Sequence, residues 1–284
     1  MKTYIVSLVL FVLTVSVYSQ EISWKRTEVN EPEKVYLFHS NEVANLPTAQ
    51  TLSKNLYEFE ISHRFIKTVD SHKSDFGLDG PAIIRMAMSY GITNDLMVSF
   101  GRSNQEDNYD LRIKYKAFQV PSKLFPVLAA LQVGGAWNTQ AIDPATGKER
   151  DLMVKKNFQY YGQLIFNTMI AKKLGIGIIP SYLYNSHIYC EDTEYSFTIG
   201  GYAQYYLSAM FSFFVETNST VTGWRQGHNP VAIGLEIETG GHFFKIFFGN
   251  SHLLNPSQYL TGADLDIYSG EWRLGFNITR LLKF

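Results

Sequence analysis

The chain has 284 residues, with 25 Lys and Arg against 26 Asp and Glu, so its formal net charge is −1. A nearly neutral chain without a basic cluster lacks the positive charge that nucleic-acid binding needs, and a hydrophobic fraction of 45% excludes intrinsic disorder. Charged residues make up only 18% of the chain, against the usual value of about 25%, whereas aromatic residues reach 15%. The composition favours a protein that keeps much of its surface out of water.

The first 20 residues have the pattern of a secretory signal peptide. Lys2 precedes an apolar stretch over residues 5–17, and Val17 and Ser19 stand at the −3 and −1 positions of a cleavage site. The apolar stretch is shorter than the roughly 20 residues that a membrane-spanning helix needs. We expect residues 1–20 to be removed on export, with cleavage after Ser19 or after Gln20. No cysteine lies near this cleavage site, so we expect no lipid anchor.

Residues 21–55 do not alternate between apolar and polar side chains. Pro32 and Pro47 interrupt the stretch, and Glu28, Glu31 and Glu33 make its first part acidic. We expect either an extended periplasmic segment or a segment folded into the mouth of the domain that follows, as a plug.

From residue 56 onward the chain has a period of two. In the clearest example Tyr109, Leu111 and Ile113 alternate with Asp110 and Arg112, as a sheet with two unlike faces requires. The segments lie near residues 56–67, 83–91, 96–103, 108–118, 126–137, 157–169, 173–184, 196–206, 209–217, 230–239, 242–250 and 269–284. Most are longer than the five or six residues usual in soluble strands, and a tilted strand across a bilayer takes about 9 to 11.

Long and short connections alternate between these segments, as in a barrel with both termini on one side of a membrane. We therefore predict an all-β fold: a closed antiparallel transmembrane β-barrel of about 12 strands over residues 56–284. Short periplasmic turns and longer extracellular loops would connect its strands, and it would reside in the outer membrane of a bacterium. A secreted sandwich is the alternative, but it would leave too many aromatic side chains for its core.

The two faces of the predicted strands differ in chemistry. We expect the apolar face to contact lipid through Phe211, Phe213, Trp272, Phe276 and the terminal Phe284, which resembles the insertion signal read by the barrel-assembly machinery. Buried charges need water or partners, so we assign the other face to a lumen. Its charged residues would be Glu58, Glu60, Arg64, Arg85, Arg112, Lys114, Lys116, Glu236, Glu238, Lys245, Glu271 and Arg273. Their order predicts an acidic sector near the first and last strands and a separate basic sector on strands two and four.

Several stretches resemble, in order, a family of β-barrels from Bacteroidota envelopes that is known only as a domain of unknown function. The matching stretches are Glu60–Phe65, Phe76–Pro81, Tyr90–Leu96, Gly101–Ser103, Lys114–Lys116, Glu238–Phe243 and Gly275–Arg280. They span roughly residues 50–284, nearly the whole mature chain. The resemblance implies a location in the outer membrane and no activity.

Catalytic and metal sites are poorly supported by the sequence. His63 and His242 are the candidates for a surface phospholipid hydrolase, but neither has a serine at a recognisable spacing. The other histidines are dispersed, so we expect no metal site and no cofactor. Cys190, the only cysteine, cannot form an internal disulfide; it has no adjacent His or second Cys, and we expect no reactive role for it.

The charged lumen is the one functional feature that the sequence predicts. A twelve-stranded barrel leaves a narrow bore at most, so we expect a pore for small polar solutes. A closed structural or assembly-partner barrel without transport is the alternative, and a surface phospholipid hydrolase is the second alternative. Membrane lipid is the expected partner in each case.

Overall fold

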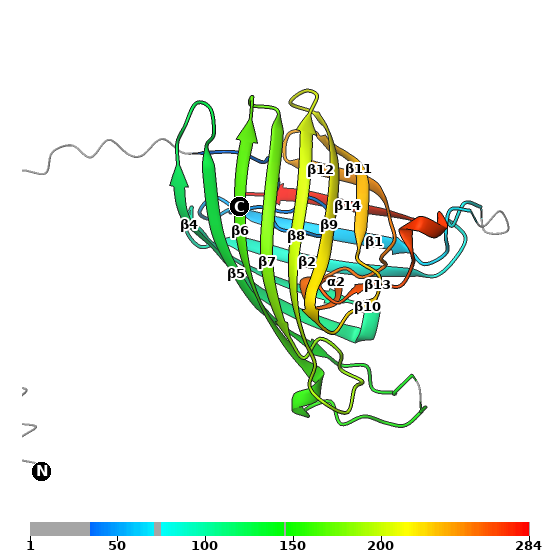
Figure 1. Cartoon of the computed structure of the whole chain (residues 1–284). Coiled ribbons are helices and arrows are strands. Elements are labelled where there is room, and N and C mark those ends of the chain that lie inside the picture. The colour runs from blue at the N-terminus through cyan, green and yellow to red at the C-terminus, as the bar shows by residue number, and fades with distance from the viewer. Residues whose placement is uncertain (1–34, 71–74, 145, 284) are drawn as a thin grey trace, which may run out of the picture. The chain divides into compact units, whose positions relative to one another are not determined.

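The computed structural model describes residues 35–70, 75–144 and 146–283. They belong to one compact unit that runs from Lys34 to Phe284. Its twelve long strands form a closed antiparallel barrel (Figure 1), which confirms the predicted fold. The predicted signal peptide, its cleavage site and Phe284 lie outside the described residues.

The barrel closes because the first strand pairs with the last. Ile61 stands opposite Ile278 on one side and opposite Met86 on the other. In chain order the barrel strands are β1 (Tyr57–Phe65), β2 (Ala82–Gly91), β3 (Leu96–Ser103), β4 (Asn108–Val120), β5 (Val127–Asn138), β6 (Phe158–Ile170), β7 (Leu174–Tyr184), β8 (Tyr195–Tyr206), β9 (Phe211–Gly223), β11 (Val231–Glu238), β12 (His242–Gly249) and β14 (Arg273–Leu282).

Two strands differ from the predicted ranges by four residues or more at one end. β9 continues to Gly223, beyond the predicted end at residue 217, because pairing with β8 extends a stretch whose Ser and Thr side chains do not alternate in polarity. β14 begins at Arg273 rather than near residue 269, because Ile267–Ser269 form a short 3-10 helix, η4, which ends on Gly270 at a φ of 78°. Glu271 and Trp272 therefore precede the barrel wall.

Most of the short connections lie at one end of the barrel and most of the long ones at the other (Figure 1). Residues 92–95, 121–126, 171–173, 207–210 and 239–241 form what we call the turn end. Ala171 and Lys172 both have a positive φ, as do Gly240 and Gly241, which suits the tight turns that join twisted antiparallel strands. At the other end, which we call the loop end, lie residues 66–70, 75–81, 104–107, 139–144, 146–157, 185–194, 224–230 and 250–272.

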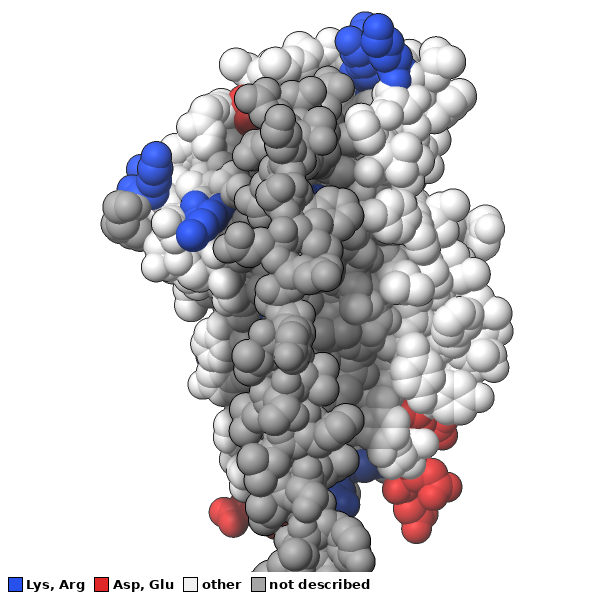
Figure 2. All heavy atoms as spheres, turned by 90° about the vertical axis from the view of Figure 1, so that its left-hand side faces the viewer, with Lys and Arg blue, Asp and Glu red and all other residues white. Residues whose placement is uncertain are grey.

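The outer face of the barrel is apolar. Phe211 and Phe213 are 44% and 51% exposed, whereas Ser212 between them is 2% exposed. Figure 2 shows one side of the molecule, where uncharged side chains cover the described wall and charged ones lie near its ends. Such a belt suits contact with lipid. Among the described residues no helix is long and apolar enough to cross a membrane.

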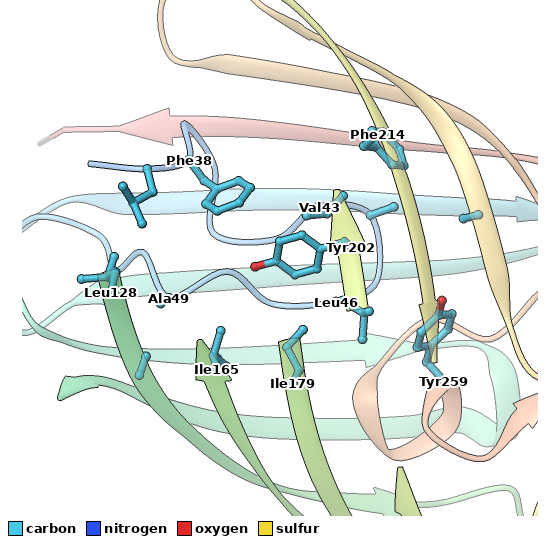
Figure 3. Packing of buried hydrophobic residues seen from close by; sticks show 14 of the residues in the cluster. Phe38, Val43, Leu46, Ala49, Leu128, Ile165, Ile179, Tyr202, Phe214 and Tyr259 are labelled. Atoms are coloured by element: carbon cyan, nitrogen blue, oxygen red, sulfur yellow. The ribbon is translucent and has the colours of Figure 1, made fainter. Parts of the chain in front are cut away.

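Two segments of the chain lie inside the barrel. Residues 35–55, which we call the plug, pack their apolar side chains against the inner faces of β5–β9 (Figure 3). Residues 250–263, which we call the insert, contain the short helix α2 (Pro256–Tyr259) and the strand β13 (Gly262–Ala263). β13 pairs in parallel with β10 (Gln226–Gly227), outside the barrel sheet. Most of the described part of residues 21–55 lies in the lumen, whereas Ser53, Lys54 and Asn55 are exposed at the turn end.

Candidate functional site

Most of the charged residues expected in the lumen are buried on the inner side of the wall. Glu58, Arg64, Arg85, Arg112, Lys114, Glu236, Lys245 and Arg273 each expose less than a tenth of their surface. Glu60, Lys116 and Glu238 are partly buried, and the latter two pair with Asp95 and His39. Glu271 is not part of the lumen wall: it lies before β14 and accepts a hydrogen bond from Ser269 at 3.1 Å.

Of the described residues that we expected to contact lipid, three lie on the outer face of the wall and one lies outside the wall strands. Phe211 and Phe213 are exposed on the outer face. Phe276 shares this face and stacks on the ring of His63, with 4.7 Å between ring centroids. Trp272 lies outside the wall strands.

The first cluster in the lumen joins β2 and β4 to the plug. Arg85 donates two hydrogen bonds to the Asp110 carboxylate, at 2.8 and 2.9 Å. Arg112 pairs with Asp110 at 3.1 Å and also with Glu42 of the plug. A fork-shaped guanidinium suits such paired contacts. Glu42 therefore adds a negative charge from the plug to the charge that Asp110 of the wall already provides to this basic sector.

A second cluster holds the first limb of the plug. Lys245 lies 3.4 Å from Glu236 and donates to the Ser40 hydroxyl at 3.0 Å. Asn41 donates its side-chain amide to Glu58 at 2.8 Å. Three strands thereby contact two successive plug residues through charged hydrogen bonds, which are stronger than neutral ones.

The tip of the plug surrounds one carboxylate. Glu216 accepts hydrogen bonds from the backbone N–H groups of Ala44, Asn45 and Leu46, at 3.0 to 3.3 Å. The Asn45 side chain donates to the same carboxylate at 2.6 Å. Tyr259 of the insert donates its hydroxyl to it at 3.3 Å. Glu216 is thus the point at which the plug and the insert meet.

Arg64 binds beside this point. Its guanidinium donates to the side-chain oxygens of Asn45 and Asn277, each at 2.8 Å. It also lies 4.4 Å from the centre of the Phe247 ring, within the range of a cation–π contact. The pairing of β1 with β14 brings Arg64 and Asn277 together.

Glycines in the wall make room for apolar plug residues. A Cβ at Gly175 would come within 2.5 Å of the Phe38 ring, and one at Gly200 within 3.2 Å of Leu46. Phe38 packs edge-on against Tyr202, with 5.4 Å between ring centroids. The wall is therefore shaped to receive these side chains.

Together the plug and the insert fill much of the lumen. Beside the cluster around Arg112 a cavity of about 10 Å³ remains, which is no more than the space of one water molecule.

The expectation of separate acidic and basic sectors was wrong, because Asp110, Glu60 and Glu42 all contact the basic residues of β2 and β4. Pairing offsets part of the large free-energy cost of burying an unpaired charge.

Three acidic residues of this network were not among the predicted lumen residues. Asp110 and Glu216 share the inward parity of Arg112 and Ser212, so the alternation of polar residues could have identified both. Glu42 lies in a stretch without periodicity, and no pattern in the sequence indicated its partner.

The histidines considered for catalysis lie on the outer face. His63 lies between the rings of Phe65 and Phe276, and Ser62 beside it points inward and donates to Glu60 at 2.7 Å. His242 stacks near Phe244, with 6.1 Å between ring centroids. The Cys190 sulfur lies 2.5 Å from a ring nitrogen of His187, so the structure places a histidine beside this cysteine although none is adjacent in the sequence.

The fold and its two faces define a membrane β-barrel. The chain belongs to the family described as the membrane bound beta barrel domain DUF5777, which matches residues 38–282. This match includes most of the plug. The family description gives a place in a membrane and no activity.

No curated protein matches the chain. Among solved structures, the NanC porin is 11% identical, has a TM-score of 0.48, and aligns over 80% of this chain and 99% of its own. The KdgM porin is 9% identical, with a TM-score of 0.43, over 79% and 98% of the two chains. Omp33 of Acinetobacter baumannii is 10% identical, with a TM-score of 0.43, over 81% and 99%.

Proposed function

We propose that this protein is a bacterial outer-membrane pore for small polar solutes, held closed by residues 35–55. Export would remove residues 1–20, and the barrel-assembly machinery would insert the barrel. The observation that carries the proposal is the plug, which occupies the lumen and contacts charged residues on most sides. As folded here, the barrel would not conduct.

The chemistry of the wall supports a lumen that can hold water. The inner faces of the strands carry Arg64, Arg85, Arg112, Lys114 and Lys245, and also Glu58, Glu60, Asp110, Glu216 and Glu236. A permanently dry core would be packed with apolar side chains, because buried ion pairs contribute little net stability. Water that entered after the plug left would solvate these groups, and polar solutes could follow.

The plug also supports the alternative, a closed barrel without transport. Its side chains and backbone are hydrogen-bonded to four strands, as a fixed core would be: Ser40 to β11, Asn41 to β1, Asn45 to β1 and β9, and the Ala44 carbonyl to β14. The two functions differ in whether the barrel survives and conducts when the plug is loosened.

We infer that the protein is not a surface lipid hydrolase. Within the described part of the chain, neither the His63 ring nor the His242 ring is hydrogen-bonded to a serine hydroxyl. A nucleophile without a base within hydrogen-bond reach is not activated.

Planar-bilayer recordings would test the proposal. The full chain should give no steady current, whereas Glu216→Ala, which removes the acceptor at the plug tip, should give openings. Glu271→Ala is the matched control, because Glu271 lies outside the wall, and it should stay closed. A steady current from the unaltered protein would contradict the closed state. A folded Glu216→Ala barrel that never conducts would favour the alternative.

A further inference from the structure

A cavity of about 240 Å³ lies at the loop end of the barrel, apart from the plug. Its lining comes from connections far apart in the sequence: Gln105 and Glu106 after β3, His187 and Tyr189 after β7, Trp224 after β9, and the insert. Drug-sized ligands occupy sites of about 300 to 1,000 Å³. This cavity is therefore suited to a single small ring.

One side of the cavity is aromatic. The ring of His187 stacks on the indole of Trp224, with 4.4 Å between centroids and 8° between planes. Tyr189 meets His187 edge-on at 6.1 Å. All three side chains are only partly buried, so this aromatic surface can be reached from solvent.

The rest of the lining is rich in amides and hydroxyls, and two of its polar atoms have no partner. Gln258 is 4% exposed and Ser186 is 3% exposed. Gln258 Oε1 and Ser186 Oγ are both buried without a hydrogen-bond partner among the described residues. Buried polar atoms are nearly always paired in native structures, so these two indicate a place for a polar ligand or water.

Glu106 gives the cavity a carboxylate. It lies in the short 3-10 helix η2 (Gln105–Asp107) at a φ of 58°, a left-handed conformation that is uncommon for this residue type. Gln258 donates to it at 3.5 Å, and within the described chain no cationic side chain forms an ion pair with it. Burial raises the pKa of this carboxyl. The group is placed to accept hydrogen bonds from a ligand.

We propose that this cavity binds one ring of a neutral sugar. The C–H face of a pyranose is apolar and can pack on Trp224, while its hydroxyls both donate to Glu106 and bond with the amides of Gln258 and its neighbours. Glu106 disfavours an anionic ligand, and the nearby charge of Arg150 disfavours a cationic one. The site stands whether or not the lumen conducts.

Saturation-transfer NMR on the full-length protein in detergent would test the site. The probes are D-glucose, D-galactose, D-mannose and N-acetyl-D-glucosamine, with D-glucuronate and choline as charged comparisons. At least one neutral sugar should bind saturably, with a dissociation constant on the order of 1 mM, and the charged probes should bind at least about tenfold more weakly.

Variants would assign the binding to this cavity. Trp224→Ala and the isosteric Glu106→Gln should each weaken it by about tenfold or more. Trp137→Phe is the matched control, because Trp137 stacks on Phe158 and does not line the cavity, and it should bind as the unaltered protein does. The proposal is overturned if no neutral sugar saturates below about 50 mM. It is equally overturned if a charged probe binds as tightly, or if both site variants bind normally.

Discussion

The plug and the insert enter one lumen from opposite ends, but they fill it differently. The plug lies among charged wall residues, where a cavity of about 10 Å³ remains beside Arg112. The insert lies at the loop end, where a cavity of about 240 Å³ remains between it and the long loops. Two buried polar atoms of its lining, Ser186 Oγ and Gln258 Oε1, have no hydrogen-bond partner among the described residues. The comparison supports the two proposals above, a lumen closed at the turn end and a ligand site at the loop end.

The largest effect is expected at Glu216, where the plug and the insert meet. Glu216→Ala leaves several plug N–H groups without their acceptor in a buried place, and it removes a negative charge from the surroundings of Arg64. We expect a loss of about 3–5 kcal/mol in the free energy of unfolding, as when a buried pair is broken. Urea unfolding in lipid vesicles would measure it, with Glu271→Ala as the control. A loss as small as that of the control would mean that the two segments are held elsewhere.

The wall itself provides the next test. Phe213→Arg places a charge on the lipid-facing side of β9 and should reduce the free energy of unfolding by about 2–4 kcal/mol. Phe213→Leu should change it little. Ser212, its inward neighbour, is unsuited as a control because it is 2% exposed and accepts a hydrogen bond from Gln204 in the filled lumen. Equal effects of the Arg and Leu variants would contradict the assignment of the outer face to lipid.

A smaller effect is expected where the wall is hollowed for the plug. Gly175→Val should displace the Phe38 ring and reduce the free energy of unfolding by about 1–3 kcal/mol, as overpacking usually does. It should also raise the frequency of openings in bilayer recordings. Gly162→Val is the control, because a Cβ there has no atom within 4 Å. If the two valine variants behave alike, Phe38 does not hold the plug at this position.

The smallest effect concerns the loop end. Burial alone would raise the pKa of Asp264, but hydrogen bonds from His252 and Arg273 hold it well below its usual range. Because the folded-state pKa is the lower one, Asp264 stabilises the fold above its unfolded pKa of about 4. This contribution is lost as the pH falls through the folded-state value.

Asp264→Asn should therefore lower the free energy of unfolding by about 1 kcal/mol near pH 6, since the side chain is 29% exposed and partly screened. The difference from the unaltered protein should shrink when unfolding is measured below about pH 4. A difference that grows toward low pH would show that Asp264 is not held by His252 and Arg273.

Much of the barrel could be predicted because its signals are local. Alternation along β4 or β6 identifies a strand from a dozen neighbouring residues, and strand length and loop order then indicate a closed barrel in a membrane. The same alternation separates outward Phe213 from inward Ser212. It failed at the polar end of β9 and before β14, where local pattern and strand pairing disagree.

The filling of the lumen depends on contacts that no local pattern contains. Asn45 and Glu216 are 171 residues apart in the sequence, and Arg112 and Glu42 are 70 apart. These pairs meet only because the plug folds into the closed barrel. The loop-end cavity likewise arises where separate connections meet. The sequence by itself determined a membrane barrel with one apolar and one charged face, because side-chain period and solvent preference act residue by residue. Only the tertiary structure decided that this charged face encloses a plug, because the pairing of charges depends on distances in the folded chain and not on their spacing in the sequence.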